Sequence, residues 1–193
     1  MILNKPYLRE IASRDNVRMD SMQWRIRNNN ERLLSEKRVY DLFISHSSLD
    51  RELILTLVDL FNKSGYSVYV DWINDRQLNR NNVDRATAET LRNRMQQARG
   101  LAYIATSNTT NSKWCPWELG YMDGKKDGKC TILPVLESSS STFKGQEYLG
   151  LYYYLTYAKV RGLNKYDFWV NDNDGAYVTL LSWLNGSKPK HHI

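Results

Sequence analysis

Residues 40–50 read YDLFISHSSLD, and this stretch decides the fold. With Val39 in front, its first half is a short apolar run, which is the pattern of a strand buried on both faces of a sheet. Between residues 53 and 61, apolar side chains recur three and four positions apart until Gly65, so the sequence predicts a helix there. A second strand, 66–70, follows. The stretch therefore opens a strand, helix, strand unit whose first strand is central in a sheet.

The same alternation continues beyond the second strand. The segments that we predict are a polar loop at 71–82, a helix at 83–99, a strand at 101–106, a helix at 112–126, strands at 131–136 and 151–160, and a helix at 176–184. Strands that alternate with helices pair in parallel, and the helices pack on both faces of the sheet. The predicted fold class is α/β, a flavodoxin-like doubly wound parallel sheet.

The first 38 residues differ in composition from the rest. Arg and Asn are frequent there, and apolar side chains are scattered. We predict an N-terminal helical extension (1–38) of one or two amphipathic helices, broken near 28–30, that packs on the main domain or on a partner. The main domain spans 39–187. Residues 188–193 form a disordered tail that could be a tag remnant, because it carries His191 and His192.

Composition is that of a folded protein of ordinary size. The chain has 193 residues, of which 41% are hydrophobic and 25% charged, enough for one domain with a modest extension. The formal net charge is +6, but acidic residues are spread among the basic ones. We therefore expect a weak preference for anionic ligands and no nucleic-acid partner.

The cysteines and apolar runs exclude further classes of function. Cys115 and Cys130 form no metal-ligand spacing with the three histidines, so we predict no metal site. No apolar run reaches the roughly 18 residues that span a bilayer, and the first residues lack a signal-peptide segment. We expect a cytoplasmic protein with reduced thiols and no membrane contact.

Polar and aromatic side chains follow the carboxyl ends of the predicted strands, where open α/β sheets bind their ligands. The loops at 45–50, 71–82 and 107–113 share that rim. The candidate residues in and next to these loops are Phe43, Ser45, His46, Asp71, Trp72, Ser112, Trp114 and Glu118.

Three stretches around these residues resemble the motif regions of bacterial and plant TIR (Toll/interleukin-1 receptor) domains. They are YDLFISHSSLD at 40–50, VYVDW at 68–72 and SKWCPWELG at 112–120. The likeness covers residues 39–136 well and the ends poorly. It implies a TIR fold in which NAD is the substrate and no cofactor is needed. In that family the acidic residue of the third motif is the catalytic glutamate of an NAD-cleaving activity, and it falls on Glu118.

The chemistry that the resemblance implies needs only one carboxylate. Nicotinamide leaves NAD from a cationic N-glycoside, so its departure requires no proton from a general acid. Glu118 would orient the ribose and place negative charge near the oxocarbenium-like carbon. Trp114, one helical turn earlier, would lie on the same helix face. Ser112 or Asn111 can cap this helix, whose amino end also favours an anion.

Each candidate also has a purely structural interpretation. Glu118 could be a solvated helix glutamate, Trp114 a core aromatic, and His46 a residue that shapes its loop. Phe43 and Ser45 would meet the ribose or phosphates. Asp71 and Trp72 border a loop that in the family moves to admit substrate and contacts other subunits.

Two arginines in that loop remain ambiguous, because Arg76 and Arg80 could pair with phosphates or simply be solvated.

Three whole-protein functions follow from these residues. The first is cleavage of the nicotinamide bond of NAD, giving ADP-ribose or a cyclic isomer. The resemblance implies a role in antiphage defence of the Thoeris kind, with self-association through TIR domains and a separate effector activated by the product. The second is a non-catalytic interaction module of the adaptor type. The third is an enzyme like nucleoside deoxyribosyltransferases, which also use a single glutamate on an N-glycoside.

Overall fold

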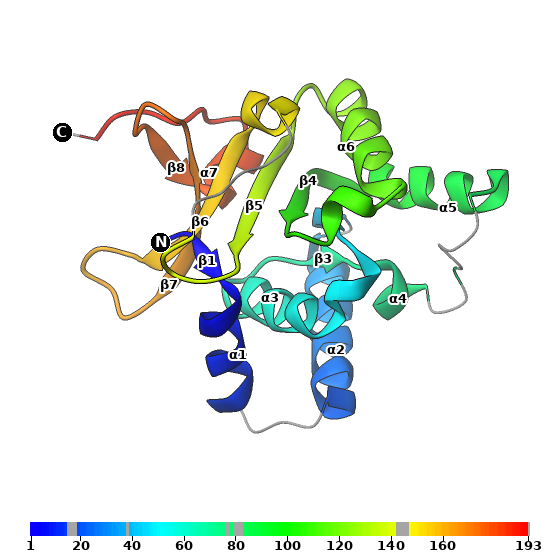
Figure 1. The fold of residues 1–193 in the computed structure, drawn as a ribbon, viewed down its shortest axis with the longest axis horizontal. Helices are drawn as coiled ribbons and strands as arrows, with labels where there is room; N and C mark the ends of the chain where they lie inside the picture. Colours follow the sequence, from blue (N-terminus) through cyan, green and yellow to red (C-terminus); the bar gives the residue numbers. More distant parts are fainter. Residues whose placement is uncertain (15–18, 38, 76–77, 79–82, 142–146, 193) are drawn as a thin grey trace.

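The computed structural model describes residues 1–14, 19–37, 39–75, 78, 83–141 and 147–192 (Figure 1). The strands are β1 (Leu3–Asn4), β2 (Tyr40–Ser45), β3 (Val68–Tyr69), β4 (Ala98–Ala105), β5 (Cys130–Leu136), β6 (Tyr153–Lys159), β7 (Tyr166–Asn171) and β8 (Tyr177–Thr179). The helices are α1 (Lys5–Arg14), α2 (Met19–Lys37), α3 (Arg51–Lys63), α4 (Asp71–Asn74), α5 (Arg85–Gln96), α6 (Trp114–Lys125) and α7 (Leu180–Leu184).

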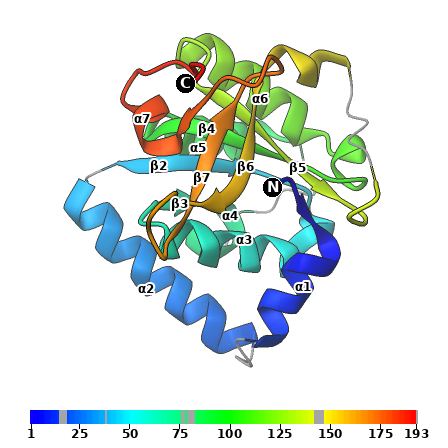
Figure 2. The same cartoon turned by 90° about the vertical axis from the view of Figure 1, so that its left-hand side faces the viewer.

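The strands form one sheet in the order β3-β2-β4-β5-β6-β7-β8. The first five pair in parallel. Numbered along the chain, these five stand in the order 2-1-3-4-5, which is the flavodoxin-like arrangement with its switch point between the first and third strands. Helices α1, α2 and α3 lie on one side of the sheet, and α5 and α6 on the other (Figures 1 and 2). The predicted doubly wound α/β fold is confirmed.

Strand β2 is central, and all six of its residues are buried. Because side chains alternate between the two faces of a strand, Leu42 and Ile44 pack with the α1–α3 side, whereas Phe43 packs with α5 and α6. Ser45, two residues after Phe43, therefore points to the α6 side at the carboxyl end of the strand.

The end of the sheet differs from the prediction. Strand β7 was not predicted, and it pairs antiparallel with β6, as β8 does with β7, so the sheet is mixed. The helix expected at 176–184 begins as strand β8 and becomes helical only at Leu180. Thr179 determines this change, because its hydroxyl caps α7 by accepting from the backbone N–H of Ser182.

Smaller corrections concern helix limits on the α5 side. The predicted helix 83–99 spans Arg85–Gln96, because Asp84 caps it by accepting from Thr87 N–H at 2.7 Å and Ala98 already belongs to β4. The predicted loop 71–82 begins with the helical turn α4.

The N-terminal residues pair with strands of the sheet. β1 pairs in parallel with the end of β5, and Met1 exchanges backbone hydrogen bonds with Tyr157 of β6. α2 runs without interruption through 28–30, so the expected break there is wrong. The reason is Asn30, whose buried side chain bonds both Val68 N (3.0 Å) and Val68 O (2.8 Å) of edge strand β3 instead of disrupting its own helix.

The C-terminal residues cover the opposite edge. Tyr177 of β8 exchanges two backbone hydrogen bonds with Lys190, and the His192 ring stacks on Tyr177 at 4.2 Å. This part of the segment 188–193, which we expected to be disordered, is therefore ordered against the sheet; residue 193 lies outside the described residues.

Candidate functional site

Glu118 is buried on α6 and faces the carboxyl end of β2. Its exposed fraction is 0%, and its Oε2 accepts a hydrogen bond from Ser45 Oγ at 2.6 Å. The interpretation of Glu118 as a solvated helix glutamate is therefore wrong. A carboxyl group enclosed at the ligand rim of an open α/β sheet is placed to act on a ligand rather than to solubilise the surface.

The start of α6 holds this carboxyl group in place. Ser112 Oγ accepts from the backbone N–H of Cys115 at 3.2 Å, so Ser112 caps the first turn, as one of the two predicted alternatives proposed. Trp114 is 6% exposed and packs edge-on against Trp117, with ring centroids 5.4 Å apart. Its position is that of a core aromatic beneath the site.

Phe43 also lies in the core rather than at the rim. Its ring is 1% exposed and stacks on Tyr69 of β3, with centroids 5.1 Å apart and planes 24° apart. Phe43 thus supports the layer directly below Ser45.

A second group of polar contacts joins the loops after β2 and β3. The indole N–H of Trp72 donates to His46 Nε2 at 3.0 Å, and His46 Nδ1 lies 3.0 Å from the carbonyl oxygen of Ile44. Asp71 Oδ1 accepts from the backbone N–H of Trp72 at 2.8 Å and lies 3.6 Å from His46 Nε2. The predicted residues thus form two contact groups, Ser45 with Glu118 and His46 with Asp71 and Trp72, which are linked by the neighbouring positions of Ser45 and His46 in the chain.

The far end of α4 is fixed by a buried acid. Asp75 accepts from Arg94 Nε (2.7 Å) and Nη2 (2.8 Å) and from the Tyr69 hydroxyl (2.8 Å). Burial pushes the pKa of Asp75 upward, but the hydrogen bonds from Arg94 and Tyr69 outweigh this effect and hold the pKa below its usual value. Burial, followed by the bond to Asp75, raises the pKa of Tyr69. α4 and its Trp72 are therefore anchored to α5 and β3.

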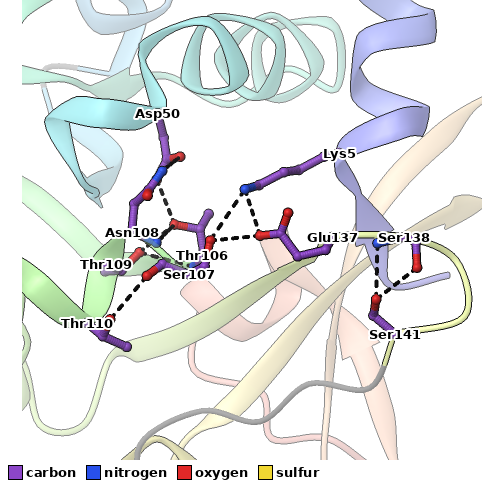
Figure 3. Close-up of polar contacts among 10 residues, drawn as sticks. All are labelled: Lys5, Asp50, Thr106, Ser107, Asn108, Thr109, Thr110, Glu137, Ser138 and Ser141. Atoms are coloured by element: carbon purple, nitrogen blue, oxygen red, sulfur yellow. Dashed lines mark hydrogen bonds and ion pairs between the residues drawn. The ribbon is translucent and has the colours of Figure 1, made fainter.

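The loops after β2 and β4 meet through Asp50 (Figure 3). Its two carboxyl oxygens accept from Thr106 Oγ1 at 2.6 Å and Asn108 Nδ2 at 2.7 Å. Asp50 directly precedes α3, the position of a helix cap, but its side chain makes no capping bond there. The donors from the loop after β4 occupy it instead.

The N-terminal extension reaches the same rim (Figure 3). Lys5 Nζ lies 2.7 Å from Glu137 Oε1, which also accepts from Ser107 Oγ at 2.7 Å. These bonds lower the pKa of Glu137, and the bond from Lys5 has the larger effect. A cavity of about 490 Å³ lies beside this network, lined by Lys5, Leu8, Arg9, Asn108 and residues 48–53.

Arg51 connects this cavity to the site. It lines the cavity, and its guanidinium lies 4.7 Å from the ring centroid of Trp72. Sequence reasoning did not single out Arg51, because a charged residue in the first turn of a helix carries no signal of such a contact. Arg76 and Arg80, for which phosphate pairing and a solvated role were both left open, lie outside the described residues.

Among the described residues, no three His, Cys, Asp or Glu side chains are grouped so that they could hold a metal ion. Within the same part of the chain, no helix has the length and apolar character needed to cross a membrane.

Comparison with protein families places the chain in one class. The model of the TIR domain family matches residues 42–181, and the chain belongs to that family.

Two relatives are informative. A probable 3' cyclic ADP-D-ribose synthase, ThsB', from Bacillus cereus (strain MSX-D12) is 45% identical over 150 residues, which cover 77% of each chain. A candidate cyclic ADP-D-ribose synthase, TIR2, from Cytobacillus dafuensis is 31% identical over 142 residues, covering 67% of this chain and 36% of that protein. The crystal structure of the TIR domain of the Toll-related receptor TRR-2 from Hydra magnipapillata covers 57% of this chain and 78% of its own, with 20% identity and a TM-score of 0.42.

Proposed function

We propose that this protein cleaves the nicotinamide N-glycosidic bond of NAD and closes the remaining ADP-ribose into a cyclic isomer. The observation that carries the proposal is the buried Glu118 carboxyl group, held by Ser45 at the rim of the sheet. The 45% identity to a protein named as a cyclic ADP-D-ribose synthase supports the same activity. NAD is the substrate, and we propose that no cofactor takes part.

In the proposed reaction, the bond between ribose C1′ and the nicotinamide nitrogen breaks. The bonding electrons pass to the ring nitrogen and neutralise its positive charge, so nicotinamide leaves without a proton. The positive charge that develops on C1′ and the ring oxygen is stabilised by the Glu118 carboxylate. The Ser45 hydroxyl fixes the orientation of that carboxylate before the substrate arrives.

The fate of C1′ distinguishes a cyclase from a hydrolase. If a hydroxyl group of the same molecule attacks C1′, its oxygen forms the new bond and its proton is released, which gives a cyclic product. If water attacks, the product is ADP-ribose. A site that excludes water favours the internal nucleophile. The relatives named as cyclic ADP-D-ribose synthases support cyclisation.

The burial of Glu118 implies a gating step. With an exposed fraction of 0%, Glu118 can meet NAD only after neighbouring side chains move. An enzyme whose competent state is a minor one binds its substrate with reduced apparent affinity. We propose that self-association through TIR domains stabilises the open state, and that the cyclic product activates a separate effector in antiphage defence, in the cytoplasm.

The decisive experiment is incubation of concentrated protein with NAD, followed by chromatography and mass spectrometry. Three proteins are compared: wild type, Glu118→Gln, and Glu89→Gln, a matched change at an exposed glutamate on α5. The side-chain amide of Glu118→Gln keeps an acceptor for Ser45, so the fold is retained while the negative charge is lost. We expect nicotinamide from wild type and Glu89→Gln, and at least roughly a hundredfold less from Glu118→Gln.

Other outcomes would assign a different function. Equal nicotinamide release by Glu118→Gln would refute the catalytic role of this carboxyl group. Cleavage of a deoxynucleoside without cleavage of NAD would select the deoxyribosyltransferase-like alternative. No cleavage at any protein concentration, with or without infected-cell lysate, would favour the interaction module.

A further inference from the structure

The imidazole ring of His46 has a defined tautomer. The carbonyl oxygen of Ile44 can only accept, so Nδ1, 3.0 Å away, carries a proton. The indole nitrogen of Trp72 can only donate, so Nε2, 3.0 Å away, carries none. His46 is 2% exposed. In this arrangement the ring is neutral, and both of its nitrogens are hydrogen-bonded within the protein.

Trp72 likewise makes contacts through its indole N–H and through one face of its ring. The guanidinium of Arg51 lies 4.7 Å from the ring centroid, and the ring packs against the apolar core on the α1–α3 side of the sheet. Its backbone N–H is held by Asp71. Arg51 therefore occupies one face of the Trp72 ring, and the indole N–H is used by His46.

A short path leads from this pair to the carboxyl group on α6. His46 follows Ser45 directly in the chain, and Ser45 Oγ donates to Glu118 at 2.6 Å. An imidazole fixed by Trp72 and Ile44 fixes the peptide next to Ser45 and so the direction of its hydroxyl. We propose that His46 and Trp72 are a positioning pair that aligns Ser45 with Glu118 instead of binding NAD, an inference that rests on the proposed function.

Protonation should break this pair. A proton on Nε2 removes the acceptor for the Trp72 indole, and Asp71 Oδ1, 3.6 Å away, becomes the available partner. The charged side chains with a described contact to the pair are Asp71 on α4, 3.6 Å from His46 Nε2, and Arg51 on α3, 4.7 Å from the Trp72 ring centroid. The bond from Trp72 favours neutral His46, so removing it favours the charged form. Without the Trp72 bond, the alignment of Ser45 with Glu118, and with it catalysis, should therefore be lost at a higher pH than in wild type as the pH falls.

The first test is spectroscopic and needs no activity. The chain has only three histidines, so imidazole nitrogen resonances in a long-range ¹H–¹⁵N spectrum can be assigned by comparison with His46→Gln. We expect wild-type His46 at neutral pH to carry its proton on Nδ1 and none on Nε2. A protonated Nε2 would overturn the proposal, whatever the variants do.

The second test is kinetic. Trp72→Phe keeps the flat ring but removes the indole N–H, and Trp24→Phe is the matched control, because Trp24 is 67% exposed on α2. We expect Trp72→Phe to lower kcat about five- to tenfold with little change in KM, and to move the acid limb of the pH profile upward. Trp24→Phe should do neither.

The kinetic results distinguish failure of the positioning role from failure of the proposed NAD cleavage. If wild type cleaves NAD and Trp72→Phe leaves both kcat and the acid limb unchanged, the positioning role is refuted while the proposed function stands. If KM rises instead, with kcat and the acid limb unchanged, Trp72 binds NAD directly and the positioning role is again refuted. If wild type itself releases no nicotinamide, the proposed function fails, and the tautomer of His46 still decides whether the pair exists.

Discussion

The hydroxyl of Ser45 donates to Glu118 across 2.6 Å and joins the end of β2 to α6, although the two residues are 73 positions apart in the chain. Both side chains are fully buried. In a buried site, a hydrogen bond to a carboxylate is stronger than it is in water. This contact therefore determines where the negative charge of the site is directed.

Replacing Ser45 with Ala should impair catalysis more than binding. The change removes one hydrogen bond to the carboxylate, a loss of about 1.5–3 kcal/mol, and leaves a hole no larger than a hydroxyl group. We expect kcat for nicotinamide release to fall roughly tenfold or more, measured at saturating NAD. Ser35→Ala, at an exposed position on α2, is the control and should match wild type. An unchanged kcat in Ser45→Ala would show that the hydroxyl does not orient Glu118.

The parts of the fold that were predictable are those with a continuous or periodic apolar pattern. β2 is buried along its entire length, so its sequence is mostly apolar and its burial could be inferred directly. β7 and β8 also contain apolar residues, but their place in the sheet depends on antiparallel pairing, of β7 with β6 and of β8 with β7, which their own composition does not reveal. β1 has two residues, too few for any period, and it exists only because β5 leaves part of its edge open.

The candidate site was predictable where one motif carries it. Ser112, Trp114 and Glu118 stand on one helix or at its start, so their spacing placed them together before the fold was known. The contact between His46 and Trp72 joins two loops and has no local signature. Asp50 likewise could not be interpreted from local sequence. It precedes a helix, but its carboxyl oxygens accept hydrogen bonds from Thr106 and Asn108 in the loop after β4.

Replacing Asn30 with Ala should destabilise the whole domain. Its side chain bonds Val68 N and Val68 O and accepts from Asn62 Nδ2 at 2.9 Å. The substitution would leave several buried backbone and side-chain groups without a partner, at roughly 1–3 kcal/mol each. We expect the free energy of unfolding in urea to fall by about 2–4 kcal/mol.

The control for this prediction is Asn28→Ala on the same helix, where the side chain is exposed. Because Ala favours helix, this variant should be as stable as wild type or slightly more stable. Equal stability of the two variants would mean that Asn30 does not hold the edge of β3.

Both cysteines should be inert in the folded protein. Cys115 and Cys130 are buried and not joined in a disulfide, and burial raises the pKa of the Cys130 thiol, so little reactive thiolate forms there. With a chromogenic disulfide reagent, we expect no fast reaction under native conditions and reaction of both thiols after unfolding in guanidinium chloride. A fast native reaction of either thiol would contradict the packing of the α6 side of the sheet.

Asp75 should stabilise the protein through its charge. It accepts two hydrogen bonds from Arg94 and one from Tyr69 and is 7% exposed. Asp75→Asn keeps the shape but removes the charge opposite Arg94. We expect a loss of about 2 kcal/mol at pH 7 in urea unfolding.

The pH dependence of that loss identifies the charge as its cause. The folded-state pKa of Asp75 is lowered, so the folded state binds the proton less readily than the unfolded state does. The charge therefore stabilises the fold above the unfolded-state pKa of about 3.9, and this contribution disappears as the pH falls through the lower folded-state value. The difference in unfolding free energy between wild type and Asp75→Asn should accordingly be constant from about pH 5 to 7 and shrink below about pH 4. A difference that stays constant down to about pH 3 would mean that packing at this position, and not the charge paired with Arg94, anchors α4 and holds Trp72 beside His46.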